Sequence, residues 1–186
     1  TNSLFVFVII FFFAFHVESA PTPPTLGNTY SIRMNITNFK SDSTLYVIEY
    51  YEYNNRTQVF YQDENAPPVG SFPPTDSEFV NLIRFNDHLA FEFSAKGCES
   101  LELANSVMQP PNVLANATYL GERKLDGILV DRWFVDYDGP SPYIFYTDQK
   151  TGEPIQMDTE TSEIRYYDYQ VGSITQPNVL TIPQHC

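Results

Sequence analysis

The sequence predicts a mainly all-β domain: an antiparallel sheet of roughly ten strands, strongly curved or partly closed, with one short helix. Apolar and polar residues alternate with period two along several stretches, which are rich in tyrosine, phenylalanine and β-branched residues. Turn-forming Asn, Asp, Gly and Pro residues separate these stretches at short intervals, and short connections favour antiparallel pairing of consecutive strands.

The alternation places the individual strands. In the first, Tyr30, Ile32, Met34 and Ile36 point to one side and polar residues to the other. Two aromatic-rich runs follow, and Asn54-Asn55 between them fits a hairpin turn because asparagine tolerates positive φ. The expected strands are residues 29–37, 44–53, 57–62, 78–85, 88–94, 118–124, 128–137, 143–148, 154–159 and 163–171.

Two stretches depart from the strand pattern. Residues 63–77 are rich in proline and acidic side chains, so we expect an irregular segment there, either a lid or a plain connection. Residues 99–108 (ESLELANSVM) are expected to form the one short helix, and QPPN at 109–112 ends it.

The N-terminus has the pattern of a signal peptide. The apolar run from Leu4 to Phe15 is shorter than the about 20 residues that span a bilayer, and it has the length of a signal h-region. Cleavage is expected after Ser19. The chain begins at Thr1 rather than Met, so we expect its extreme N-terminus to be missing. The expected organisation is a signal peptide at 1–19, a proline-rich leader at 20–27 and one domain at 28–186, secreted or lumenal.

Export through an oxidising compartment predicts two modifications. Asn35, Asn55 and Asn116 each begin an Asn-X-Thr triplet without proline, and we expect them to carry N-linked glycans. The two cysteines, Cys98 and Cys186, are most simply one disulfide. Closing so long a loop stabilises the fold by about 4 kcal/mol.

The charge balance excludes some partners. With 23 acidic and 10 basic residues the net charge is −13, whereas nucleic-acid binding needs clustered Lys and Arg. The same sign disfavours anionic membrane surfaces. No apolar run after the signal approaches the length of a membrane span.

No catalytic constellation can be recognised, so the sequence predicts a protein that is not an enzyme and needs no cofactor or metal. The cysteines are better explained as a disulfide, and the histidines after the signal lie in a turn (His88) and beside the last residue (His185). Carboxylates are plentiful, but their spacing does not favour a glycosidase pair. Asp136-Tyr-Asp138-Gly begins like a calcium loop and then fails, which leaves only looser calcium binding open.

The aromatic content, with 13 Tyr and 15 Phe, has two interpretations. The tyrosines of the predicted strands either fill the core and stiffen the sheet through cross-strand pairs, or line the hollow side of the sheet as a wall for an apolar ligand.

Several motifs resemble the LolA-like domain that precedes the papain-like protease in certain cysteine proteinases of invertebrates and protists. The similar segments are YYEYNNRTQVFY (50–61), YLGERKLDGILVDRWFVDY (119–137), FYTDQKTGEPIQMD (145–158) and IRYYDYQVGS (164–173). Gly121, Gly127 and Trp133 match a glycine and tryptophan strand pair, and Pro183-Gln-His-Cys186 matches a closing Pro-x-x-Cys. The resemblance implies a curved antiparallel half-barrel wrapped on a helix, a fold shared with ependymin-related proteins.

This resemblance suggests three functions. In the first, the half-barrel holds a lipid or other hydrophobic ligand, with a wall that includes Tyr30, Ile32, Phe91, Phe93, Trp133 and Tyr146. In the second, the domain is the N-terminal accessory or protein-interaction module of a cysteine proteinase whose catalytic segment is not part of this sequence. In the third, it is an ependymin-like extracellular glycoprotein, and the acidity and the three sequons support this function.

Overall fold

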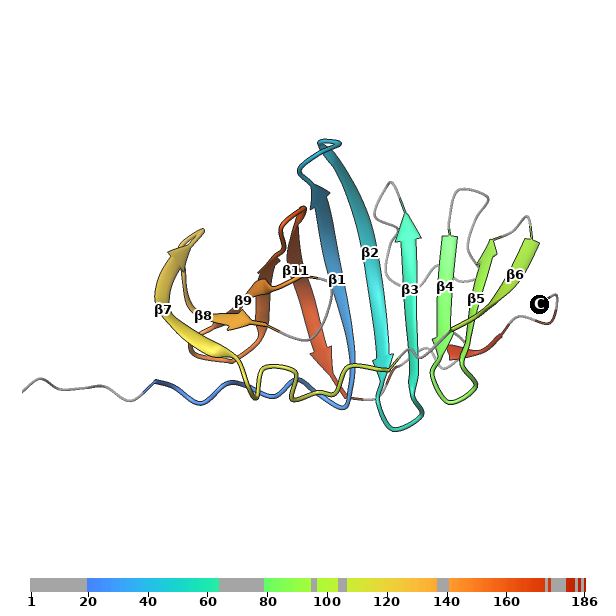
Figure 1. Ribbon diagram of the computed structural model, residues 1–186, viewed down its shortest axis with the longest axis horizontal. Helices are drawn as coiled ribbons and strands as arrows, with labels where there is room; N and C mark the ends of the chain where they lie inside the picture. Colours follow the sequence, from blue (N-terminus) through green and yellow to red (C-terminus); the bar gives the residue numbers. More distant parts are fainter. Residues whose placement is uncertain are drawn as a thin grey trace, which may run out of the picture.

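The computed structural model contains one open antiparallel sheet of eleven strands, curved along its length (Figure 1). The structure describes residues 20–63, 79–94, 97–103, 107–136, 141–172, 174, 180–182, 184 and 186. The strands are β1 (Thr29–Asn38), β2 (Ser43–Glu52), β3 (Thr57–Asp63), β4 (Phe79–Arg84), β5 (Leu89–Ser94), β6 (Gly97–Glu102), β7 (Thr118–Leu125), β8 (Ile128–Val135), β9 (Tyr143–Asp148), β10 (Pro154–Asp158) and β11 (Ser162–Val171).

Two meanders meet in the middle of the sheet. Strands β1 to β6 and strands β7 to β11 each pair consecutively, and β11 returns to pair with β1, which gives the order β6-β5-β4-β3-β2-β1-β11-β10-β9-β8-β7. The all-β prediction and its antiparallel pairing are confirmed. Short turns explain the consecutive pairing, but nothing local in the sequence specifies the contact of β1 with β11.

The core changes from one face of the sheet to the other at β2. We call the side that carries Tyr30, Ile32 and Met34 the Tyr30 face, and the opposite side the Ile48 face. Five consecutive residues of β2, Val47 to Tyr51, are buried, so this strand is covered on both faces. The period-two alternation predicted for β1 is confirmed by its burial pattern.

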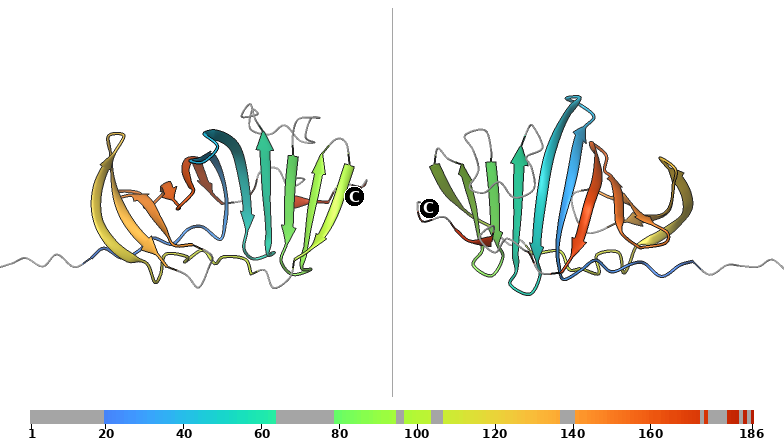
Figure 2. Two further views of the ribbon diagram at one scale, coloured as in Figure 1. Left: turned by 45° about the horizontal axis from the view of Figure 1, so that its top comes forward. Right: turned by 180° about the vertical axis from the view of Figure 1, so that it is seen from behind.

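The Tyr30 face is buried from β2 across to β8. Two segments outside the sheet, residues 20–28 and 107–117, run side by side across one end of the strands (Figure 2). The second forms consecutive turns at residues 111–116. Leu26 and Met108 pack on Tyr30, Ile32 and Val47, while Leu114 packs on the buried indole of Trp133. The C-terminal end of the proline-rich leader is thus in contact with the domain.

The Ile48 face is buried from β2 to β5, where Val80 and Leu82 are completely buried. The C-terminal residues Ile174, Leu180 and Ile182 pack against this cluster. A disulfide joins Cys98 of β6 to Cys186 and holds this end of the chain against the sheet.

The predicted helix at Glu99–Met108 is wrong. Gly97–Glu102 forms edge strand β6, and residues 107–110 have no regular structure. Pairing with β5 satisfies the backbone groups of this segment, and Leu103 N donates to His88 O at 2.8 Å. The tertiary pairing and the disulfide at Cys98 outweigh the helical propensity of ESLELA. β6 also raises the strand number from the expected ten to eleven.

The hairpin predicted about Asn54-Asn55 is confirmed, as is the turn at Asn86-Asp87. Arg56 and His88 adopt positive φ at the ends of these two turns. The acidic, proline-rich segment predicted at 63–77 lies outside the described residues except for Asp63 in β3. Within the described part of the chain, no helix is long and apolar enough to cross a membrane.

Candidate functional site: an aromatic cavity

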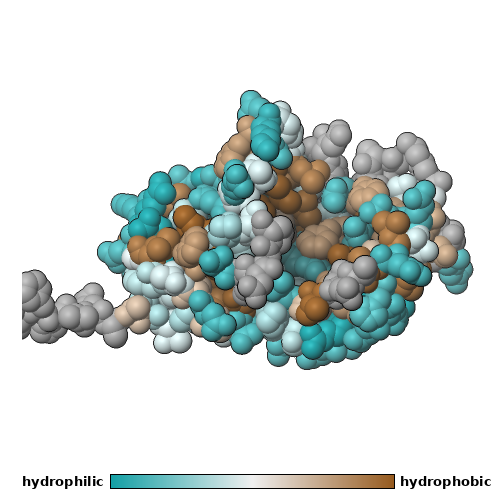
Figure 3. Space-filling view, viewed as in Figure 1, coloured by the Kyte–Doolittle hydropathy of each residue, from teal (hydrophilic) through white to brown (hydrophobic). Residues whose placement is uncertain are grey.

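A cavity of about 420 Å³ lies on the Tyr30 face, between the sheet and the segment 107–113. We call it the aromatic cavity. Its lining is formed by Leu26, Tyr30, Tyr51, Gln58, Gln109, Pro110, Pro111, Val113, Ser141, Tyr143, Phe145, Met157 and Tyr166. Figure 3 shows apolar residues gathered around a hollow below the projecting β1–β2 hairpin. The aromatic cavity lies towards the other end of these two strands, where Tyr30 pairs with Tyr51.

The segment over the cavity is held by hydrogen bonds from both of its neighbours. The hydroxyl of Tyr51 donates to the carbonyl of Gln109 at 2.5 Å, and Leu26 N donates to Pro111 O at 2.9 Å. Pro110 and Pro111 have no N–H to satisfy, so the segment can cross an apolar region without losing donors. We refer to residues 107–113 as the strap.

One side of the cavity is a stack of tyrosines. The rings of Tyr30 and Tyr51 are nearly parallel with centroids 4.6 Å apart, and Tyr53 continues the stack at 6.3 Å from Tyr51. The guanidinium of Arg56 lies 4.0 Å over the ring of Tyr53 and closes the stack at its solvent end. The strand register explains this arrangement, because Tyr30 pairs directly with Tyr51 across β1 and β2.

A buried carboxyl group lies behind the tyrosines. Glu49 is 8% exposed and its Oε1 accepts hydrogen bonds from Tyr30 Oη at 3.2 Å and Gln58 Nε2 at 2.6 Å. Burial raises the pKa of Glu49 above its ordinary value, and the two hydrogen bonds offset part of that rise. Because Tyr30 and Gln58 line the cavity, the hydrogen bonds that they donate to Glu49 fix the orientation of the cavity's polar groups.

The other side of the cavity is apolar. Phe145 and Tyr166 pack with ring centroids 5.7 Å apart, and the hydroxyl of Tyr166 contacts the sulfur of Met157 at 3.9 Å.

Burial raises the pKa values of Tyr30, Tyr51 and Tyr166. These tyrosines therefore keep their protons at physiological pH and act as neutral hydrogen-bonding groups.

The lining of the cavity offers aromatic rings, aliphatic groups, amides, phenols and the hydroxyl of Ser141. These groups can bind an apolar molecule and donate or accept hydrogen bonds at its polar end. Among the described residues, no group of three or more His, Cys, Asp or Glu side chains could hold a metal ion.

The structure does not bring the six predicted wall residues together. Tyr30 lines the cavity, while Ile32 is buried beside it on the same face. Phe91 and Phe93 lie on the Ile48 face with the C-terminal residues. Trp133 belongs to the cluster around Leu114, where its Nε1 donates to Thr147 Oγ1 at 2.9 Å. Tyr146 points away from Phe145 and packs with Val130.

Most of the lining was not predicted from the sequence. The register of β1 with β2 identifies Tyr51, and the alternation of β9 identifies Phe145, once Tyr30 is known to face the cavity. The sequence does not identify the strap, because it predicts a helix at residues 99–108 and the end of that helix at residues 109–112. The predicted glycosylation sites Asn55 and Asn116 are exposed, and Asn35 is half-buried in β1.

Comparison with solved structures shows a shared fold. An uncharacterised conserved protein from Thermus thermophilus is similar over 86% of this chain and 88% of its own, with a TM-score of 0.56 and 10% identity. MucB in complex with MucA(peri) and the Pseudomonas aeruginosa MucA/MucB complex give TM-scores of 0.44 and 0.45 at 12% and 13% identity. The alignments cover 86% and 85% of this chain but 56% of each MucB-complex chain, so nothing about function follows from these two structures.

No curated protein matches the chain in sequence. The family described as "Domain of unknown function (DUF8395)" matches residues 30–186, which is nearly the whole described domain. The chain belongs to this family.

Proposed function

We propose that this member of the DUF8395 family is an exported, non-enzymatic domain that shelters a lipid or other hydrophobic small molecule in the aromatic cavity. The observation that carries the proposal is the cavity itself, about 420 Å³ of space between the strap and an aromatic sheet face. Known ligand pockets occupy roughly 300 to 1,000 Å³, with mainly apolar walls and a few polar groups that fix orientation. The signal-peptide pattern at 1–19 supports export.

The composition of the lining supports an apolar guest with one polar end. Phe145, Met157 and Leu26 offer surface on which each Å² of buried apolar area contributes about 25 cal/mol. Tyr30 and Gln58, both fixed by Glu49, offer phenol and amide groups at one side. A molecule with a hydrocarbon body and a single hydroxyl, carbonyl or carboxyl group fits this division.

A second candidate function is a protein-interaction module, such as the accessory domain of a cysteine proteinase. The observation in its favour is the exposed apolar surface of the outer hairpin β7–β8, where Leu120, Ile128 and Leu129 are each about 40% exposed. β7 is also an edge of the sheet, and edge strands can accept a further strand from a partner.

A matched pair of variants tests the first proposal. Val113 lines the cavity from the strap, whereas Val107 on the same segment is 78% exposed. Val113→Phe should fill part of the cavity and weaken binding of a fluorescent fatty-acid probe by about tenfold or more, which corresponds to about 1.4 kcal/mol. Val107→Phe should leave the affinity unchanged.

Two results would contradict the proposal. Equal probe affinity of Val113→Phe and wild type would show that the probe binds elsewhere. Absence of saturable probe binding by the wild-type protein would leave the protein-interaction function as the better explanation, and the β7–β8 surface would then be tested with Leu129→Glu in a co-purification from its native fluid.

A further inference from the structure

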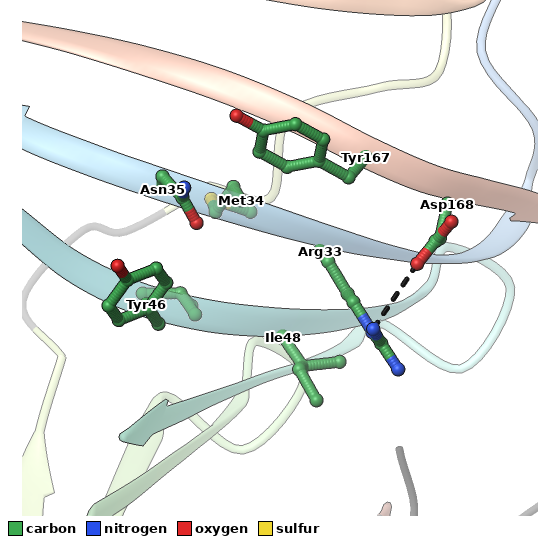
Figure 4. Close-up of a pocket in the computed structure, with 8 residues that line it drawn as sticks. Arg33, Met34, Asn35, Tyr46, Ile48, Tyr167 and Asp168 are labelled. Atoms are coloured by element: carbon green, nitrogen blue, oxygen red, sulfur yellow. Dashed lines mark ion pairs between the residues drawn. The ribbon is translucent and has the colours of Figure 1, made fainter. Parts of the chain in front are cut away.

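A second pocket lies on the Ile48 face, across the sheet from the aromatic cavity. It has a volume of about 340 Å³ and is formed where β11, β1 and β2 lie side by side. Arg33 and Asn35 of β1 lie in its centre, with Tyr46 and Ile48 of β2 on one side (Figure 4). Tyr167 and Asp168 of β11 complete the other side. We call this pocket the outer groove.

An irregularity in β11 shapes one end of the outer groove. The pairing register of β1 with β11 shifts between Ser31 and Arg33, and Asp168 has a φ of 51°. A bulge of this kind redirects a side chain that would otherwise follow the pleat. Here it places Asp168 Oδ2 3.3 Å from Arg33 Nη1.

One hydrogen-bond donor of Arg33 is buried without a partner among the described residues. Its Nε is buried, and no hydrogen-bond partner for it exists in the described part of the chain. The ion pair with Asp168 uses Nη1 only. A buried donor without an acceptor is costly, so the groove is short of one acceptor beside Arg33.

The groove also contains a predicted modification site. Asn35 begins the triplet Asn35-Ile36-Thr37 and lies directly opposite Tyr46 in the register of β1 with β2. Figure 4 shows Tyr46 and Tyr167 on the two flanking strands. The residue paired with Asn35 on β11 is Arg165, and Tyr167 lies diagonally from Asn35, opposite Arg33. The other two predicted sites differ, since Asn55 and Asn116 are exposed in a turn and in the segment before β7.

We propose that the outer groove is the seat of the chain's own N-linked glycan, whose first N-acetylglucosamine lies on the sheet at Asn35. A sugar attached there leaves the sheet next to Tyr46, the direct neighbour of Asn35 on β2, with Tyr167 in the diagonal position on β11. Such a sugar presents C–H groups to aromatic faces, and its acetamide carbonyl brings an acceptor next to the side chain of Arg33, which is 37% exposed. The proposal rests on the export included in the proposed function, but not on the aromatic cavity.

Resistance to enzymatic deglycosylation tests the seating. The protein secreted from eukaryotic cells is treated with a peptide-N-glycosidase under native conditions, and conversion of each asparagine to aspartate is followed by peptide mass spectrometry. The glycan at Asn35 should be released about tenfold or more slowly than those at Asn55 and Asn116, as expected for a group protected by local structure. Denatured protein should lose all three glycans at similar rates.

Variants separate seating in the groove from simple crowding on the strand. Tyr46→Ala and Tyr167→Ala should each bring the release at Asn35 to within about threefold of that at Asn116, because protection depends on the contacts that remain. Phe79→Ala, which removes a partly exposed aromatic ring on β4, should leave the protection intact. Far-UV circular dichroism of each variant confirms that the sheet is retained.

Each outcome of the deglycosylation experiments either supports or overturns the proposal. Protection at Asn35 that both tyrosine variants abolish supports the proposal. Equal release at all three sites, or protection that survives both variants, overturns it. Glycans at Asn55 or Asn116 with a bare Asn35 would overturn it while leaving export intact, and a secreted protein with no glycan at all would also overturn it. Failure of export would instead contradict the proposed function.

Discussion

At the scale of single residues, the most unusual group is the carboxyl of Glu49. It is buried in the sheet between two donors, Tyr30 and Gln58, which both reach the aromatic cavity. A buried carboxyl is favoured in its neutral form, which explains the raised pKa. Its position suggests that it fixes the orientation of the cavity's polar groups.

Glu49→Gln should change how stability depends on pH. The folded-state pKa lies above the unfolded value of 4.5, so the stabilisation is complete below pH 4.5 and is lost as the pH rises through the folded pKa. Relative to wild type, Glu49→Gln should gain about 1.4 kcal/mol in the free energy of unfolding per pH unit across that window. Urea unfolding from pH 4 to pH 8 measures this gain.

The control for this series is Glu102→Gln, which removes an exposed carboxyl at the end of β6. It should show no comparable trend. A stability difference between Glu49→Gln and wild type that stays constant from pH 4 to pH 8 would contradict a neutral Glu49 in the folded protein.

Tyr51→Phe tests the attachment of the strap. The change keeps the ring stack but removes the hydroxyl that donates to Gln109 O. The free energy of unfolding should fall by about 1 kcal/mol. A bound apolar probe should dissociate faster in stopped-flow measurements, since the strap is less firmly held. An unchanged dissociation rate would show that the strap does not control access to the cavity.

At the scale of elements, local patterns predicted ten of the eleven strands because each is bounded by turn residues and alternates in polarity. The element that was missed, β6, has its structure imposed by pairing with β5 and by the disulfide at Cys98. The strap was missed for the same reason. Its conformation depends on Tyr51 and Leu26, which are distant in sequence from Gln109 and Pro111.

The C-terminal segment gives an element-scale prediction. Replacing Cys98 and Cys186 together by alanine removes a cross-link between residues 88 positions apart, and should lower the free energy of unfolding by about 4 kcal/mol. Ile174, Leu180 and Ile182 should then detach from the Ile48 face. Amide hydrogen exchange in β4 and β5 should increase more than exchange in β8 and β9. A uniform increase across the sheet would contradict a local role for this segment.

At the scale of the whole molecule, the sheet is too long and too strongly curved for all of its strands to pack around one hydrophobic core. Its larger clusters lie on the Tyr30 face in the β7–β11 half and on the Ile48 face in the β3–β6 half, with β1 and β2 at the crossing. A smaller cluster around Val130 and Tyr146 lies on the Ile48 face of the β7–β11 half. Among the described residues, turns and irregular chain rather than a long helix cover each half. The aromatic cavity lies beneath one of these irregular segments, the strap.

The sheet was therefore far more predictable from the sequence than the site. Alternation shows which residues share a face of a strand, but not which face is covered or by what. Tyr30 was identified because it begins the clearest alternating strand, while Phe91 and Tyr146 were assigned to a common wall although they face the other side of the sheet from Tyr30. The register between strands, which only the fold supplies, decides these positions.

The most direct test of the central claim is mass spectrometry of the protein secreted from eukaryotic cells, recorded first under native and then under denaturing conditions. We predict that the native protein carries additional mass, which disappears on denaturation and belongs to an apolar molecule of lipid or comparable chemistry. In Val113→Phe this additional mass should be reduced or absent. Equal native and denatured masses of the wild-type protein would contradict the claim that the aromatic cavity holds a guest.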